Sequence, residues 1–400
     1  MRSFPGAVRK RLAGLRDRVK GRIDRLREER IVQRCEADLR TMPARTLAVL
    51  LPFPGHLKFV ADTLAEVRAK GVTLHCFTDE AFILELRRSL GTDHVYPYRL
   101  CPRLRYRVIL TPATHIPFKK YKNPGSVVVH LPHSMVSLHT IFPADTFLGF
   151  DHVLCCGPHH VREITAIFKH SGQRGQAWET GYEVIDRLGR EVGGRSGHRR
   201  PCILIAPTWG PSSLLYRFGR DLVDRLTPHY DVILRPHKWK MEEIAGMLDD
   251  LRRDHTGNQG FAIDLDADPK PSMEAADLMI SDHSGAAFEF ALGCLRPVVF
   301  IDGPRKNAHI NWREVLDEEG IEVIGRTRIG TVVKDLDEAE NTIRSLLADP
   351  GSAEQKGRKA REEILFNYGR CAPVAAERLL EILGTPPANA THGGGTARYI

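Results

Sequence analysis

The stretch ADLMISDHSGAAFEFA, residues 276–291, decides how this chain folds. It begins with a short apolar run, typical of a buried strand, that ends at Ser281. Small polar residues then form a turn, and a helix-period pattern begins near Ser284. Because a strand that leads directly into a helix is half of a βαβ unit, the stretch predicts a parallel sheet covered by helices.

The same alternation of strand and helix fills most of the chain. A first series of expected strands covers residues 46–51, 73–78, 107–111, 126–131 and 152–156. A second series covers residues 202–206, 231–235, 261–265, 277–281 and 297–301. The Gly- and charge-rich residues between the two series predict a linker. The fold class is therefore α/β, with two Rossmann-like, doubly wound domains that face each other across a cleft.

A length of 400 residues exceeds what one hydrophobic core usually serves. We predict six segments: a basic amphipathic helical arm (1–42), a first Rossmann-like domain (43–188), a linker (189–201), a second Rossmann-like domain (202–349), C-terminal helices (350–385) and a disordered tail (386–400).

Positive charge is concentrated in the arm. Residues 1–34 hold twelve Lys/Arg and four Asp/Glu, a net of +8 that equals the formal charge of the whole chain. The neutral remainder has no basic surface motif with interleaved aromatics, so no nucleic-acid partner is expected. Apolar residues recur in the arm at steps of three or four, which predicts one apolar stripe: Val8, Leu12, Leu15, Val19, Ile23 and Leu26. Such a helix suits an anionic membrane surface; alternatively, it packs on its own protein or on a second copy.

No apolar run approaches the roughly 18 residues that span a bilayer, and the start lacks the apolar segment of a secretory signal. The eight cysteines are scattered without a Cys-x-x-Cys pair, as expected of buried thiols in a reducing compartment. Zinc-ligand spacing is lacking too, and we expect neither a metal nor another cofactor. The predicted location is cytoplasmic, peripheral at the inner face of the cell membrane.

The turn after the strand that ends at Ser281 suits a pyrophosphate. With Asp282 it leads to Ser284, whose hydroxyl and neighbouring backbone N–H groups begin a helix, and to Gly285, which lets a phosphate approach the backbone. One turn later, Glu289 can accept hydrogen bonds from ribose hydroxyls. The alternative is an ordinary N-capped helix with an exposed glutamate.

Two further strand ends in the second half carry candidate donor-binding residues. Arg235, His237 and Lys238 can hold the phosphate charge of a departing nucleotide, or they cap the next helix and do nothing else. In the loop after residues 202–206, Thr208 can bind a donor and Trp209 can cover a base. Equally, this loop contains only the cap of the following helix.

His133 follows the strand at 126–131 and faces the same expected cleft from the first half. A histidine with a pKa near 6.5 can accept the proton of an acceptor hydroxyl. His130 and His139 lie nearby, and a single histidine is more often structural.

Taken together, the Ala-Pro-Thr-Trp loop at 206–209, the Arg-Pro-His strand end at 235–237 and the Ser-Asp-x-Ser segment at 281–284 resemble the CDP-glycerol glycerophosphotransferase family. The segment GYEVID at 181–186 is similar to that family's crossing between domains, with Glu-Val in place of Pro-Arg. The resemblance implies a GT-B fold and a role in teichoic acid or capsule synthesis. It also implies an acceptor-activating role for His133, a donor-phosphate role for His237 and a pyrophosphate contact for Ser284.

Three positions depart from the family pattern. The family usually has Gly where this chain has Ser134, Lys where it has Leu138, and a second serine where it has Gly285. The resemblance implies transfer of an alditol phosphate from a CDP-linked donor to a hydroxyl of a lipid-linked or polymeric glycan, with release of CMP. The alternatives are a GT-B glycosyltransferase or sugar-nucleotide epimerase that uses the same cleft, and a non-catalytic nucleotide-binding member.

Overall fold

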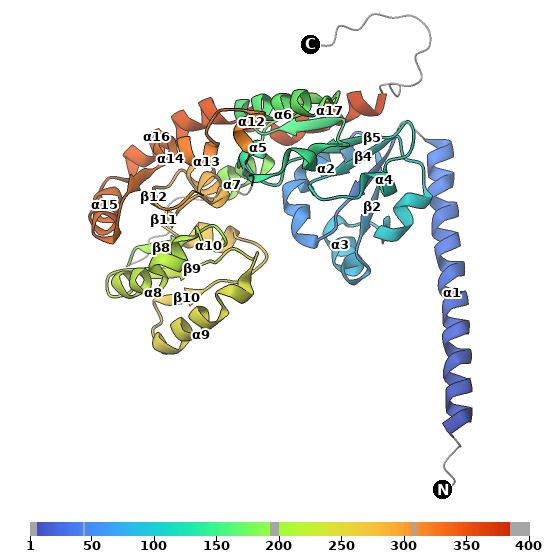
Figure 1. Cartoon of the computed structure of the whole chain (residues 1–400), viewed down its shortest axis with the longest axis horizontal. Coiled ribbons are helices and arrows are strands. Elements are labelled where there is room, and N and C mark those ends of the chain that lie inside the picture. The colour runs from blue at the N-terminus through green and yellow to red at the C-terminus, as the bar shows by residue number, and fades with distance from the viewer. Residues whose placement is uncertain (1–5, 43–44, 193–199, 306–308, 310, 385–400) are drawn as a thin grey trace, which may run out of the picture.

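The computed structural model describes residues 6–42, 45–192, 200–305, 309 and 311–384, with side chains from residue 20 onward. Figure 1 shows two α/β halves beside each other and one long helix, α1, that projects from the first half. The predicted tail at 386–400, residues 1–5 and the middle of the predicted linker lie outside the described residues.

The first half is built on a seven-stranded parallel sheet in the order β3-β2-β1-β4-β5-β6-β7. Its strands are β1 (Thr46–Leu50), β2 (Thr73–Thr78), β3 (Val95–Pro97), β4 (Val108–Thr111), β5 (Val127–His130), β6 (His152–Cys155) and β7 (Gln176–Glu179). The second half has six parallel strands in the order β10-β9-β8-β11-β12-β13. They are β8 (Cys202–Ile205), β9 (Asp231–Leu234), β10 (Phe261–Ile263), β11 (Leu278–Ser281), β12 (Val298–Ile301) and β13 (Thr331–Val333).

In each sheet the order in which strands are added reverses once. The reversal lies between β1 and β4 in the first half and between β8 and β11 in the second. Ligands of doubly wound sheets bind in the crevice beyond the carboxyl ends of the strands at this reversal. The predicted fold class is confirmed, and the ten predicted strands all form. The short strands β3, β7 and β13 were not predicted.

Helices cover both sheets. In the first half they are α2 (Ala61–Ala69), α3 (Ile83–Leu90), α4 (Phe118–Tyr121), α5 (Leu138–Ile141), α6 (Pro158–Ser171) and α7 (Glu183–Glu191), with 3-10 turns η2 (Pro54–Phe59), η3 (Glu80–Phe82), η4 (Tyr98–Arg103) and η5 (Ala144–Phe147). In the second they are α8 (Leu214–Leu226), α9 (Ala245–Asp254), α10 (Lys270–Ala275), α11 (Gly285–Glu289), α12 (Trp312–Val315), α13 (Ile321–Ile324), α14 (Arg326–Ile329), α15 (Leu336–Ala348) and α16 (Pro350–Ile364), with the 3-10 turn η6 (Met241–Glu243) and the π-turn η7 (Phe290–Cys294).

The chain crosses between the halves at α7 and returns at its end. The last helix, α17 (Cys371–Gly384), packs on α2, and five of its apolar side chains join the core of the first half: Ala375, Ala376, Leu379, Ile382 and Leu383. Asp186 of α7 accepts hydrogen bonds from the backbone N–H groups of Gly369 and Cys371, at 2.8 and 2.9 Å. The two crossings therefore lie side by side and are tied to each other.

The predicted N-terminal helix is present as α1 (Gly6–Thr41). Its last third lies on the first half: Val32 and Cys35 are buried, and Asp38 accepts a hydrogen bond from Nε2 of buried His75 at 3.0 Å. Arg99 and Arg103 form ion pairs with Glu28. None of the described helices is long and apolar enough to cross a membrane.

Candidate functional site

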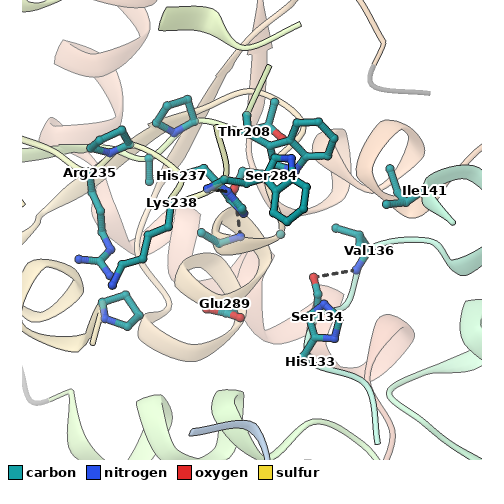
Figure 2. Close-up of a pocket in the computed structure, with 18 of the residues that line it drawn as sticks. His133, Ser134, Val136, Ile141, Thr208, Arg235, His237, Lys238, Ser284 and Glu289 are labelled. Carbon is teal, nitrogen blue, oxygen red and sulfur yellow. Dashed lines mark hydrogen bonds between the residues drawn. The ribbon is translucent and has the colours of Figure 1, made fainter. Parts of the chain in front are cut away.

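A cavity of about 630 Å³ lies between the two halves and is lined by both. Figure 2 shows His133 and Ser134 on one side and Arg235, His237, Lys238 and Ser284 on the other. The lining residues follow β1, β4 and β5 in the first half, and β8, β9 and β11 in the second. The loops at the carboxyl ends of both sheets therefore converge on one space, as the fold requires.

His133 enters the cavity wall directly after β5. Its Nδ1 lies 2.8 Å from the carbonyl oxygen of Pro112, which accepts a hydrogen bond only if Nδ1 carries the proton. Burial lowers the pKa of His133 below its ordinary 6.5, and the nearby Lys58 charge acts in the same direction. The imidazole is therefore neutral near pH 7, with Nε2 left as a proton acceptor.

Lys58 and His56, which belong to none of the predicted site motifs, follow the carboxyl end of β1. The half-buried Lys58 ammonium lines the cavity, and burial lowers its pKa while Glu289 opposes that shift. The His56 ring centroid is 6.0 Å from that of His133, and burial lowers the pKa of His56 to about 4. The sequence signal was available, because residues 54–58 follow a buried strand just as His133 does.

Glu289 is buried in the cavity wall instead of exposed to solvent. It accepts a hydrogen bond of 2.8 Å from the hydroxyl of Tyr182, which also lies 3.2 Å from the carbonyl oxygen of His133. Burial raises the pKa of Glu289, and the Lys58 charge opposes the rise. Tyr182 thus links a donor-side carboxyl to the loop that carries His133.

The three basic residues after β9 differ in their exposure to solvent. Arg235 is paired with Asp264 and donates to the carbonyl oxygen of Asp266 at 2.8 Å, so part of its hydrogen-bonding capacity is used. His237 and Lys238 are exposed and line the cavity. Nδ1 of His237 accepts the backbone N–H of Trp239 at 3.1 Å, which assigns the proton of the neutral ring to Nε2.

Thr208 and Trp209 line the same cavity after β8. The Thr208 hydroxyl is buried and, among the described residues, has no hydrogen-bond partner. Buried hydroxyls are rarely left unpaired, so this one is suited to a ligand. Trp209 packs near Trp239 with ring centroids 6.1 Å apart, which gives the cavity an aromatic edge. Ser213, not Thr208, caps α8 by accepting the N–H of Leu215.

Ser284 and Gly285 line the cavity at the start of α11, and the Ser284 hydroxyl caps that helix through the N–H of Ala286. Ser281 and Asp282, which the sequence grouped with them as donor-binding, do not line the cavity. Both are buried, and Ser281 donates to the carbonyl oxygen of Ala206 at 2.7 Å. The Asp282 carboxylate accepts the N–H groups of Thr208 and Leu214, and thereby fixes the loop after β8. These two residues therefore hold the loop after β8 in place without lining the cavity.

The loop after His133 is held from both halves. His159 and His160 of α6 lie 2.9 Å from the carbonyl oxygens of Met135 and Val136. Two buried residues that follow His133 make three hydrogen bonds with α13 of the second half: Glu322 accepts the Ser137 N–H and the Thr140 hydroxyl, and the Ser137 hydroxyl accepts the Ile321 N–H. His139 also hydrogen-bonds across the interface, to the carbonyl oxygen of Glu318.

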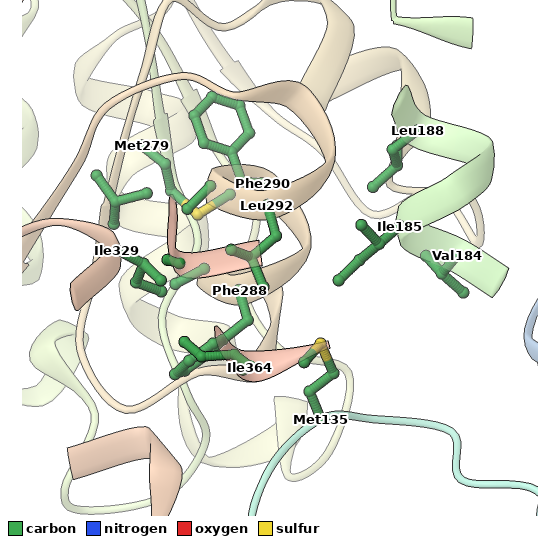
Figure 3. Close-up of a cluster of buried hydrophobic side chains, with 14 of the residues drawn as sticks. Met135, Val184, Ile185, Leu188, Met279, Phe288, Phe290, Leu292, Ile329 and Ile364 are labelled. Carbon is green, nitrogen blue, oxygen red and sulfur yellow. The ribbon is translucent and has the colours of Figure 1, made fainter. Parts of the chain in front are cut away.

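Apolar packing completes this support. Met135 is inserted between the halves and packs in one buried cluster with residues of α7, α11 and α16, as Figure 3 shows for Ile185, Phe288 and Ile364. A rigid apolar contact on one side and hydrogen bonds on the other leave the His133 loop little freedom. The cavity is therefore bounded by parts whose positions are set by the interface itself.

Three solved structures share this architecture. The wall teichoic acid polymerase TagF matches with a TM-score of 0.58 at 12% identity, over 90% of this chain and 98% of that one. A putative UDP-N-acetylglucosamine 2-epimerase from Listeria monocytogenes gives 0.55 at 12% identity, over 89% and 99%. The S. aureus MnaA–UDP structure gives 0.54 at 12% identity, over 82% and 94%. The two sheets and the cavity between them define a protein of the GT-B type.

The family comparison is more specific. Residues 175–305 match the model of the CDP-glycerol:poly(glycerophosphate) glycerophosphotransferase family, which confirms the resemblance drawn from the motifs. The matched segment includes the loops after β8, β9 and β11 that line the cavity. No curated protein matches the chain.

Proposed function

We propose that the chain transfers an alditol phosphate, glycerol phosphate or a close analogue, from a CDP-linked donor to a hydroxyl of a lipid-linked or polymeric glycan. The acceptor oxygen attacks the alditol-side phosphorus, and its proton passes to Nε2 of His133. The bond between that phosphorus and the bridging oxygen breaks, and CMP departs with the electron pair. His237 and Lys238 stabilise the charge on the leaving phosphate.

One observation carries the proposal: a neutral histidine with an acceptor nitrogen lines the cavity from the first half, and the charged Arg235 and Lys238, with His237 between them, line it from the second. Transfer needs a base for the acceptor and positive charge for the leaving group, held at a fixed separation. Ser284 and the unpaired hydroxyl of Thr208 add donors for phosphate oxygens, while Trp209 provides a surface for the base. The fixed cations can take up the departing charge without a metal.

Nucleotide release tests the proposal directly. Purified protein is incubated with CDP-glycerol, CDP-ribitol or UDP-sugars and a glycan acceptor, and the released nucleotide is identified by chromatography. We expect CMP from a CDP-alditol, in amounts that follow acceptor concentration. Release of UDP would instead assign the cavity to a glycosyltransferase. Tight binding of a nucleotide with no turnover of any donor would assign the chain to the non-catalytic class.

We also propose that the arm attaches the protein to an anionic membrane surface, where lipid-linked acceptors lie. About 54 Å of helix is expected from 36 residues at 1.5 Å each, and Figure 1 shows the N-terminal part of α1 clear of both sheets. Ile23 and Leu26 are 45% and 55% exposed. Because Leu26 and buried Cys35 are nine residues apart, they lie on opposite faces of the helix, so Leu26 is turned away from the first half.

Deletion of residues 1–22 tests this attachment without removing the part of α1 that is docked. The deletion removes eight Lys/Arg and one Asp, a net of +7. We expect the full chain to sediment with vesicles containing anionic lipid, and the shortened chain to remain in solution with unchanged turnover of a soluble acceptor. Vesicle binding that survives the deletion would contradict the proposal, as would a dimer that dissociates on deletion without any vesicle binding.

A further inference from the structure

Gly285 faces Ser134 across the boundary between the two halves. A Cβ atom placed on Gly285 would lie 2.6 Å from Oγ of Ser134 and 3.2 Å from a methyl group of Val136. A distance of 2.6 Å is shorter than any stable contact between a carbon and an oxygen, so a side chain at position 285 requires Ser134 to move. The absence of a side chain at 285 is therefore what leaves room for the Ser134 hydroxyl.

The Ser134 hydroxyl lines the cavity with an unused hydrogen-bond donor. Its oxygen accepts the backbone N–H of Val136 at 3.3 Å, and no described residue accepts its own proton. Its neighbours are fixed: His133 is bonded through Nδ1, and Met135 is buried between the halves. Figure 2 shows Ser134 beside His133 on the first-half wall. The hydroxyl is thus held beside the proposed base and against the loop that carries Ser284.

Ser134 and Gly285 are 151 residues apart in the chain, yet the fold brings them together. A Cβ atom at position 285 would displace the Ser134 hydroxyl, so a side chain at 285 and this hydroxyl compete for the same part of the cavity wall.

We propose that Ser134 contacts the donor phosphates, and that its hydroxyl replaces, from the first half, one that a side chain at position 285 would supply from the second. This inference rests on the proposed function, because it assigns the ligand to a phosphorylated nucleotide. Because the Ser134 hydroxyl belongs to the first half, binding of the CDP-linked donor then depends on both halves. Donor phosphate then links the two walls of the cavity instead of occupying only one.

An exchange of the two side chains tests the idea. The variants are Ser134→Gly, Gly285→Ser and the double exchange, with Gly246→Ser as a control at an exposed site with open space. We expect Ser134→Gly to weaken CDP binding about tenfold, since a hydrogen bond to a charged group is lost. Gly285→Ser alone should weaken it at least as much, because of the clash. The double exchange should recover most of the affinity, and the control should leave it unchanged.

Calorimetric titration with CDP measures the affinities, and thermal unfolding reports whether each variant folds. Ser134→Gly creates no clash, so it remains informative if Gly285→Ser does not fold. Unchanged CDP affinity in Ser134→Gly, or a double exchange that is as weak as the two single losses combined, would overturn the proposal. Failure of the proposed function looks different: the wild-type protein binds a nucleotide but releases no CMP, while the exchange still alters affinity for that nucleotide.

Discussion

The two walls of the cavity are built in opposite ways. On the second-half wall, His237, Lys238 and Trp239 are exposed at the end of β9, where solvent reaches them freely. On the first-half wall, Lys58 and His133 are half-buried, and burial lowers the pKa of each. The difference suggests a division of tasks. An exposed cation attracts and holds a charged donor, whereas a buried, uncharged imidazole is prepared to accept a proton.

The largest effect is expected on the first-half wall. Replacing His133 by Ala should reduce turnover by roughly a hundredfold to ten-thousandfold, because the variant lacks the proposed base. CDP affinity should change little. Initial rates of CMP release and a CDP titration provide the two readouts, with His170→Ala, an exposed histidine at the end of α6, as the control. Turnover that is unaffected by His133→Ala would remove the base from the mechanism.

The pH dependence sharpens this test. A general base must be unprotonated, and the pKa of His133 lies below 6.5, so kcat/KM should be constant near pH 7 and fall only as the pH drops below 6.5. A fall that begins above pH 7 would exclude His133 as the base. In the Ala variant, the residual rate should lack this acidic limb.

On the second-half wall, His237→Ala should reduce turnover by about a hundredfold to a thousandfold, the cost of removing one donor that stabilises developing charge. A Gln variant, which retains an N–H donor, should recover part of the loss. The exposed His229 serves as the control site. Equal defects in the Ala and Gln variants would indicate a structural role, exerted through the bond between His237 and the N–H of Trp239.

A Lys58 variant tests whether the first-half wall also takes part in binding the donor. It is the first-half cation in the cavity, and it acts with the second-half cations on the same ligand if the donor phosphates lie between them. Lys58→Met should weaken CDP binding about tenfold, with a smaller effect on kcat, since the charge contributes to binding in the ground state too. Lys119→Met is an exposed control in the first half. A loss confined to kcat would instead give Lys58 a role in the chemical step.

The sequence predicted the second-half wall well because its motifs are local. A buried strand, a polar turn and a helix start lie within a few residues of each other, so His237 and Ser284 could be placed from the pattern alone. The first-half wall depends on contacts far apart in sequence, such as Tyr182 with Glu289 and Ser134 with Gly285. No local pattern encodes those. The return of α17 to the first half is a long-range contact of the same kind, and the predicted segments left it unassigned.

The contacts of Glu183, another departure from the family motif, are seen only in the folded structure. It occupies a position in the crossing segment where the resembled family has Pro, and its buried carboxyl accepts the N–H groups of Asp62 and Thr63 at 2.9 Å, at the start of α2. Burial raises the pKa of Glu183 to about 7. The crossing helix is thereby tied to the helix that follows the Lys58 loop.

The buried histidines are expected to affect turnover at neutral pH least. Their expected effect is on the free energy of unfolding at acidic pH. Burial lowers the pKa of eight histidines of the first half: His56, His75, His94, His130, His133, His152, His159 and His160. In the unfolded chain these groups protonate near pH 6.5. The unfolded state therefore binds more protons at acidic pH, and the free energy of unfolding decreases as the pH falls below 6.5.

His75, fully buried with a pKa of about 4, should alone contribute a loss of roughly 2 kcal/mol by pH 5. Glu183 acts in the opposite sense, because a raised carboxyl pKa adds stability as the pH falls through 7. The raised pKa values of Glu289 and His139 act in that sense too, but these three groups oppose eight histidines. Peptide-resolved hydrogen exchange between pH 7.5 and 5 should therefore show β5 and β6 losing protection before β9 and β11. His75→Gln should flatten the pH dependence of unfolding, even where it lowers stability at pH 7.5. Equal loss of protection in both halves would mean that their shared apolar interface, and not the eight histidines of the first half, sets the response to acid.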